Sequence, residues 1–263
     1  MTEPANQSVL RVFVITQDDP RYVAAFFDEF LNRLTRDQCA PIALVGAMIQ
    51  KPLGNKTSRG LFKRVYGLYG FWGTFRMVFR IAWARLTDQT VAGHFQRHHV
   101  PVYPGANANS AAFRQWVQEN RIDLIVSVAA AQIFKEPILD APPMGCINLH
   151  NAPLPDYRGM LPNFWQMYHG ESESVLTIHK MVPELDKGDI LLQHRTTIDP
   201  GETLDSLMLK TKRRSAGALC ELLAQLARGP VEAQPLPDRP GSYFTFPTKE
   251  DAAEFRRRGY RVI

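Results

Sequence analysis

Residues 146–190 read CINLHNAPLPDYRGMLPNFWQMYHGESESVLTIHKMVPELDKGDI, and this segment decides the expected fold and site of the chain. It opens with a short apolar run that carries Asn148 and His150. Side chains two positions apart on a strand point to the same side of a sheet, so an amide and an imidazole should face one site. A proline-rich loop follows, then a second apolar run at 175–181, and then a turn that presents Asp186.

These three polar residues suit chemistry on a carbonyl group. The amide of Asn148 could hold an oxygen that becomes an oxyanion. The imidazole of His150 could move a proton, and the carboxylate of Asp186 could orient the imidazole and stabilise its charge. Alone, each residue is more often part of a turn, but together they favour a catalytic site. His179 and His169 are weaker candidates, and His179 could face either the site or the core.

The same segment resembles the core of the folate-dependent formyltransferases. The shared pattern is N-x-H-x-x-x-L-P-x-x-R-G followed by T-I-H-x-M-x-x-x-L-D-x-G-x-I-L, and the resemblance extends from about residue 124 to residue 193. This family includes methionyl-tRNA formyltransferase, glycinamide ribonucleotide transformylase and the amino-sugar N-formyltransferases. The resemblance implies that Asn148, His150 and Asp186 are catalytic, that an amine attacks the formyl carbon of 10-formyltetrahydrofolate, and that no metal is required.

The resemblance also implies binding residues. A turn of small residues would border the folate pocket, and a loop before Asp186 would meet the pterin through its backbone, although Pro183 lacks one backbone donor. These folate-binding residues are Ala129, Ala130 and Ala131 in the turn, and Val182, Pro183, Glu184 and Leu185 in the loop. Arg158 could contact a phosphate of the acceptor bidentately, or it could brace the loop, and the sequence leaves both roles open.

The rest of the chain predicts an α/β fold. A β-branched run at 9–16, apolar residues at helical spacing over 21–34 and an apolar run at 41–49 form a βαβ opening, which predicts a parallel sheet. The run at 123–130 is almost continuously apolar, as expected for a strand covered on both faces. We therefore expect a Rossmann-like, mostly parallel sheet with helices on both faces. No Gly-rich fingerprint follows the first strand, so a dinucleotide site is not expected.

Residues 54–86 form an unusual insertion in which apolar and aromatic residues recur at helical spacing between basic ones. Glycines in the middle predict two helices joined near Gly70. The favoured interpretation is an amphipathic insertion that packs on the sheet or forms a subunit contact. The alternatives are a surface for a membrane or a lipid-linked substrate, and a surface for RNA.

The chain is expected to divide into a catalytic domain at 1–200 and a C-terminal helix and tail at 201–263, a small C-terminal appendage. The additional β-barrel domain of methionyl-tRNA formyltransferases is expected to be absent. The sequence contains neither a signal-peptide pattern nor an apolar run long enough to span a bilayer, so a cytoplasmic location is expected. The net charge of +5 suits an anionic substrate.

The expected function is transfer of a formyl group from 10-formyltetrahydrofolate to a small-molecule primary amine, with an amino-sugar nucleotide as the favoured acceptor. Other acceptors are an amino acid, a siderophore hydroxylamine, a lipid-linked amino sugar or methionyl-tRNA. A hydrolase that releases formate from the same folate would share the three polar residues. A folate-binding protein without turnover is a third class. A nucleic-acid partner is not expected, and a homodimer is an open alternative.

Overall fold

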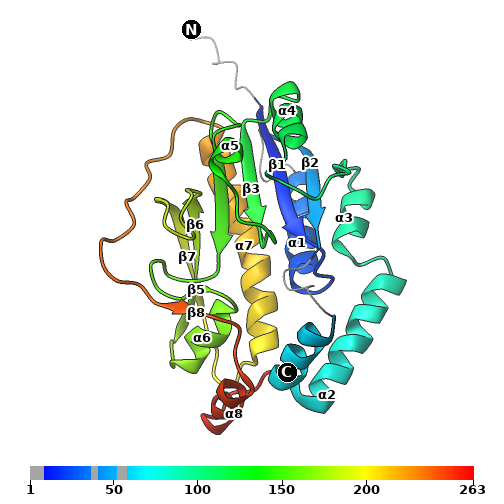
Figure 1. Ribbon diagram of the computed structural model, residues 1–263, viewed down its shortest axis with the longest axis vertical. Helices are drawn as coiled ribbons and strands as arrows, with labels where there is room; N and C mark the ends of the chain where they lie inside the picture. The colour runs from blue at the N-terminus through cyan, green and yellow to red at the C-terminus, as the bar shows by residue number, and fades with distance from the viewer. Residues whose placement is uncertain (1–8, 37–40, 52–57) are drawn as a thin grey trace.

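The computed structural model describes residues 9–36, 41–51 and 58–263. A six-stranded sheet forms its centre, with the strand order β2-β1-β3-β4-β6-β7 (Figure 1). The first four strands in this order are parallel, and β6 and β7 are antiparallel to their neighbours. The strands are β1 Leu10–Gln17, β2 Ile42–Gln50, β3 Leu124–Val128, β4 Cys146–His150, β6 Glu173–Lys180 and β7 Ile190–Thr197. The predicted α/β fold with a mostly parallel sheet is confirmed.

Alternate residues of β1 pack into two apolar layers, one on each face of the sheet. Val12 and Val14 join a core cluster with α1 Tyr22–Thr35 and α7 Leu204–Leu226, whereas Phe13 and Ile15 join a second cluster with α4 Ala111–Glu119 and α5 Glu136–Leu139. The alternation follows from the two-residue period of a strand. Both faces of the sheet are therefore covered by helices, as predicted, and α3 Val91–Arg97 lies against α1.

The C-terminal appendage returns to the loop that follows β4. There β5 Arg158–Gly159 pairs with β8 Tyr243–Phe244, next to α6 Pro162–Tyr168 and α8 Lys249–Arg257. Gly159 has a φ of +99°, and a Cβ at this position would lie 2.2 Å from the Phe244 carbonyl oxygen. Only glycine permits this approach. Rings from α6 and α8 stack, with the centroids of Phe164 and Phe255 4.6 Å apart. The division of the chain at residue 200 stays a prediction.

The insertion forms α2 Ser58–Leu86, with non-helical φ and ψ of 67° and −174° at Gly70. This break confirms the predicted junction of two helices. Residues 54–57 of the predicted insertion lie outside the described residues. The inner side of α2 is held by α8, where Arg256 donates a hydrogen bond of 2.5 Å to the Leu68 carbonyl oxygen. Within the described ranges, no helix is long and apolar enough to cross a membrane.

Candidate active site

Strand pairing brings the polar residues of β4 and β6 together. Asn148 lies opposite His179, and His150 lies opposite Thr177 in the antiparallel register. Asp186 is carried by the turn between β6 and β7 and is buried, with a φ of +54°. The three predicted catalytic residues therefore converge, and His179, the weaker candidate, joins them at the centre of the group.

The distances define two histidine contacts to one carboxylate. His179 Nε2 lies 3.6 Å from Asp186 Oδ1, and His150 Nδ1 lies 3.8 Å from Asp186 Oδ2. His150 Nε2 is 3.0 Å from the carbonyl oxygen of Tyr157. Because that carbonyl can only accept, Nε2 carries the proton of neutral His150, and the lone pair of Nδ1 faces Asp186. The atom of His150 that is free to take a proton is therefore Nδ1.

Asn148 is oriented by His179. The Nδ1–H of His179 donates to the Lys180 carbonyl oxygen at 2.8 Å, so in neutral His179 the Nε2 atom is an acceptor. The side-chain NH₂ of Asn148 lies 3.3 Å from this Nε2 and donates to it. One N–H of Asn148 is engaged in this way, and its second N–H remains for another acceptor.

Burial and neighbouring charges set different protonation states for His150 and Asp186. Burial lowers the pKa of His150, although Asp186 and the Tyr157 carbonyl act in the opposite direction. Burial alone would raise the pKa of the Asp186 carboxyl, but the positive charge that His179 and His150 carry when protonated outweighs burial and holds this pKa below its ordinary value. At neutral pH the site therefore holds a carboxylate beside a neutral imidazole, which is the arrangement a general base requires.

Gly188, the second residue after Asp186, has a steric role. A Cβ at Gly188 would lie 1.9 Å from the carbonyl oxygen of Lys180. The turn therefore returns so close to the end of β6 that only glycine fits, and this approach fixes the carboxylate of Asp186 next to His179. The spacing Asp-x-Gly in the sequence thus has a physical cause in the close contact between this turn and β6.

Buried amides hold the loop after β4. Gln166 Nε2 on α6 donates to the Asn151 carbonyl oxygen at 2.7 Å, and its Oε1 accepts from the Val175 amide at 3.1 Å. Thr177 Oγ1 donates to the Ala152 carbonyl oxygen at 2.6 Å. These bonds tie the loop to β6, because buried backbone groups need partners.

A pocket of about 100 Å³ opens beside Asn148, His179 and Asp186. Its other lining residues come from the end of β3, the turn after it and the turn after β6: Ser127, Ala130, Gln132, Ile133, Phe134, Met181, Val182, Pro183, Glu184 and Leu185. Of the predicted folate-binding residues, Ala130 and all of 182–185 line this pocket. Ala129 and Ala131 do not, and the Ala131 amide instead donates to Gln50 Oε1 at 2.8 Å.

Two cationic side chains lie near the site without a hydrogen bond or ion pair to the described residues. The Nε of Arg158 is buried and makes no hydrogen bond to them. Lys212 on α7 makes no hydrogen bond or ion pair there either, and its charge acts on His150 and Asp19. Burial lowers the pKa of Lys212, against the attraction of Asp19. Sequence analysis missed Lys212, because nothing in a helical pattern tells which lysine faces a site.

Part of the chain is similar to known proteins. Residues 87–223, just over half of the chain, match the family model described as formyl transferase. Methionyl-tRNA formyltransferase of Pelobacter propionicus is 37% identical over 153 residues, which cover 58% of this chain and 48% of that protein. The enzyme of the same name from Thermotoga maritima is 33% identical over 156 residues, which cover 59% and 50%. The chain spans about half the length of the curated relatives it matches.

Solved structures of low sequence identity share the fold. Glycinamide ribonucleotide transformylase 1 of Symbiobacterium toebii superposes with a TM-score of 0.60 at 18% identity, covering 90% of this chain and 98% of that chain. An N-formyltransferase of Helicobacter canadensis, solved with folinic acid and dTDP-3-aminofucose, gives 0.53 at 15% identity, covering 90% and 71%. The sheet and its helices therefore follow an architecture that these proteins share.

Proposed function

The chain belongs to the formyl transferase family, and from this membership we propose that it transfers a formyl group from 10-formyltetrahydrofolate to the primary amine of a small molecule. The observation that carries the proposal is the convergence of four polar side chains: Asn148, His179 and Asp186 line one pocket, and His150 lies next to Asp186. The turn at 182–185 and Ala130 would hold the pterin of the donor in that pocket.

Each side chain has a defined part in the proposed reaction. The amine nitrogen forms a bond to the formyl carbon, and the carbonyl electron pair moves to oxygen. Asn148 donates its free N–H to this oxyanion, a contact that contributes about 10²–10³ in rate in enzymes of this chemistry. His150 accepts the amine proton at Nδ1, and the adjacent Asp186 carboxylate stabilises the resulting imidazolium. The electron pair on oxygen then re-forms the carbonyl, the bond from the formyl carbon to the donor nitrogen breaks with its electrons on nitrogen, and His150 returns the proton to that nitrogen.

An amino-sugar nucleotide is the acceptor we favour. The unpartnered Nε of Arg158 and the partly buried Lys212 provide positive charge next to the site, which suits the phosphates of such a molecule. The Helicobacter canadensis protein of similar fold was solved with a nucleotide-linked amino sugar. Arg158 would contact the acceptor, although bracing the paired segment with β8 stays an alternative role.

Methionyl-tRNA is the second candidate acceptor, because the relatives with 33–37% identity are methionyl-tRNA formyltransferases. Here the amine would be the α-amino group of the esterified methionine. An amino acid, a siderophore hydroxylamine and a lipid-linked amino sugar would use the same chemistry. A hydrolase would use water in place of the amine.

The acceptor can be identified with a donor labelled with carbon-13 in its formyl group. The protein is incubated with this donor and with one amine at a time, including dTDP-amino sugars and charged methionyl-tRNA, and each product is analysed by mass spectrometry. We expect the label in the amide of a dTDP-amino sugar. Label in methionyl-tRNA would establish the second candidate, and label found only in formate would establish the hydrolase.

A further inference from the structure

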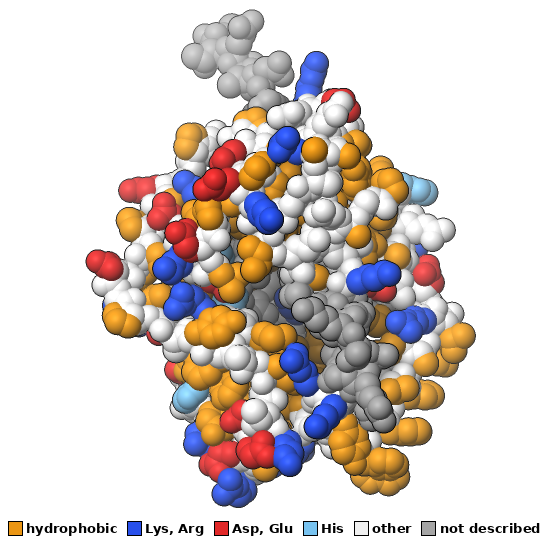
Figure 2. All heavy atoms as spheres, viewed as in Figure 1, with side chains coloured by type: hydrophobic (Ala, Val, Ile, Leu, Met, Phe, Trp, Pro, Cys, Tyr) orange, Lys and Arg blue, Asp and Glu red, His pale blue; other side chains and the backbone are white. Residues whose placement is uncertain are grey.

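The outer side of α2 is an exposed aromatic stripe. Seven large apolar side chains, each with an exposed fraction between 56 and 83%, follow one another at helical spacing: Phe71, Trp72, Phe75, Val78, Phe79, Trp83 and Leu86. In Figure 2 hydrophobic side chains gather over α2 at the lower right of the molecule. We call these seven residues the α2 stripe. Exposed apolar patches of this kind mark sites of interaction.

The stripe is fixed outward because the inner side of α2 is engaged. The side chains of Leu68, Met77 and Ala84, which belong to α2, are buried. Arg80 forms an ion pair of 3.1 Å with Asp205 on α7. The hydroxyls of Tyr69 and Tyr22 are 3.2 Å apart. A rotation that would bury the stripe against the protein would break these contacts, so the stripe needs an external partner.

Charge identifies the partner. The sequence of α2 contains six arginines and lysines and no aspartate or glutamate. Arg76 and Arg85 are exposed among the stripe residues, and Lys63 and Arg64 are exposed before the break at Gly70. A twofold contact between two copies of this helix would place like charges against each other. A helix with exposed tryptophan and phenylalanine on one side and basic residues beside them is typical of helices that lie in the interface of an anionic bilayer.

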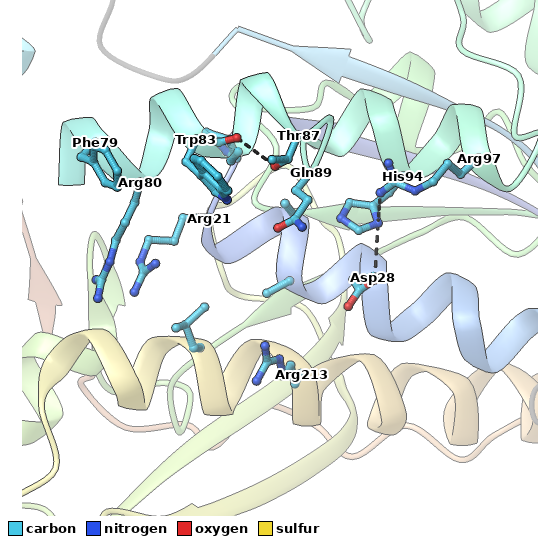
Figure 3. A pocket seen from close by; sticks show the side chains of 15 residues that line it. Arg21, Asp28, Phe79, Arg80, Trp83, Thr87, Gln89, His94, Arg97 and Arg213 are labelled. Atoms are coloured by element: carbon cyan, nitrogen blue, oxygen red, sulfur yellow. Dashed lines mark hydrogen bonds and ion pairs between the residues drawn. The ribbon is translucent and has the colours of Figure 1, made fainter. Parts of the chain in front are cut away.

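A recess of about 860 Å³ adjoins the stripe. Phe79 and Trp83 belong to both, and Figure 3 shows Trp83 and Arg80 reaching from α2 towards the helix that carries Arg213. Arg21 and Arg80 both pair with Asp205, whereas Arg213 makes no hydrogen bond or ion pair with the described residues. The recess therefore offers a free guanidinium next to an apolar surface, the combination that an anionic lipid headgroup requires.

We propose that α2 binds this protein to the surface of an anionic phospholipid bilayer, with the α2 stripe in the interface and a lipid phosphate in the recess beside Arg213. The helix lies on the membrane and does not cross it, in agreement with its basic residues. This inference does not depend on the acceptor or on the catalytic reaction.

Vesicle sedimentation tests the stripe. The whole protein is mixed with vesicles of phosphatidylcholine alone or with phosphatidylglycerol added. We expect binding that needs phosphatidylglycerol, weakens with salt and shifts tryptophan emission to shorter wavelength through Trp72 and Trp83. The variant W72S/F75S/L86S should lose this binding, whereas V102S/M144S, which changes exposed apolar residues elsewhere, should keep it. Equal binding by the two variants, or no binding by the unaltered protein, would overturn the proposal.

A second pair of variants tests the recess. Arg213→Gln should lower the vesicle partition coefficient about fivefold, and Arg214→Gln, which removes the same charge one position along the helix, should change it less. An equal loss in both would refute the headgroup site. Sedimentation velocity without vesicles tests whether the stripe instead binds a second copy of the chain. The stripe would be assigned to that contact if the unaltered protein forms a dimer, the W72S/F75S/L86S variant does not, and the unaltered protein does not bind vesicles.

Discussion

His179 Nε2 lies 3.6 Å from Asp186 Oδ1, slightly nearer than the 3.8 Å that separates His150 Nδ1 from Asp186 Oδ2. The Asp186 carboxylate therefore lies next to two imidazoles, one on each of its oxygens. His179 also accepts the Asn148 amide, so it connects the proposed oxyanion donor to the proposed charge-stabilising group. We infer that His179 is a positioning residue of the site.

The positioning role of His179 predicts a specific kinetic effect. Replacing His179 with alanine leaves both Asn148 and Asp186 without this contact, so kcat should fall, by up to about 10²-fold if the amide moves by 1 Å. His179→Asn, whose side-chain oxygen can still accept from Asn148, should restore part of the rate. Equal kcat values for His179→Ala and the unaltered protein would contradict this role.

Asn148→Ala should lower kcat by about 10²–10³ with little change in KM for the folate donor, because the lost N–H bonds the developing oxyanion. Steady-state kinetics at saturating donor measure this. The control is Asn32→Ala, which removes an amide of α1 whose hydrogen bonds within the described part of the chain are to Asp28. A change in KM alone would mean that Asn148 binds donor and transition state equally.

His150 makes stability depend on pH. Burial holds the pKa of folded His150 below the unfolded value of about 6.5. Above about pH 6.5 His150 is neutral in both the folded and the unfolded chain, and its burial does not reduce the free energy of unfolding. As pH falls below that value the unfolded chain binds a proton that the folded chain does not, so the free energy of unfolding decreases until the folded pKa is passed. Urea denaturation should show this loss in the unaltered protein and a smaller loss in His150→Gln.

The control for this measurement is His98→Gln, which leaves the surroundings of His150 intact and should keep the slope of the unaltered protein. A slope in His150→Gln as steep as that of the unaltered protein would show that another group causes the pH dependence. The lowered pKa of Asp186 also makes the free energy of unfolding decrease as pH falls, but this decrease occurs at more acidic pH, below about 3.8.

Gly188→Ala should destabilise the protein by about 1–3 kcal/mol or more, because the added methyl would collide with the Lys180 carbonyl oxygen. Activity should fall as well, since the same turn carries Asp186. Gly67→Ala on α2 is the matched control, because among the described residues its Cβ would meet Lys249 at an ordinary 3.6 Å. It should stabilise the helix by about 0.5–1 kcal/mol. Thermal denaturation distinguishes the two variants.

Lys212→Met tests the acceptor side of the site. If Lys212 contacts a phosphate of the acceptor, its loss should raise KM for that acceptor about tenfold or more and leave KM for the donor unchanged. Arg214→Met, on the same helix, is the matched control. A rise in the donor KM in place of the acceptor KM would assign Lys212 to the folate.

The parts of the site that sequence could predict are those fixed by local spacing. Asn148 and His150 share a face because they are two apart on a strand, and Asp186 is placed by the close return of the turn at Gly188. The role of His179 was not predictable, because it depends on the antiparallel register that sets it opposite Asn148. Periodicity fixes the faces of a strand but does not fix its partner.

Long-range packing explains the other residues that were missed or misplaced. The pairing of β5 with β8 joins segments about 85 residues apart, and no turn chemistry connects them. Ala129 and Ala131 belong to the small-residue turn that sequence singled out, yet only Ala130 lines the pocket. Which side chain of a turn reaches a pocket depends on its backbone angles, here a φ of +54° at Ala129.

The central claim is tested most directly by the release of tetrahydrofolate from 10-formyltetrahydrofolate, measured with and without amine acceptors. We expect release that requires one class of amine, with one formyl group gained by that amine for each tetrahydrofolate formed. Asp186→Asn, which keeps the shape of the side chain but removes its charge, should abolish most of this release. Release without any amine, or an unchanged rate in Asp186→Asn, would contradict the proposed transfer and the site that performs it.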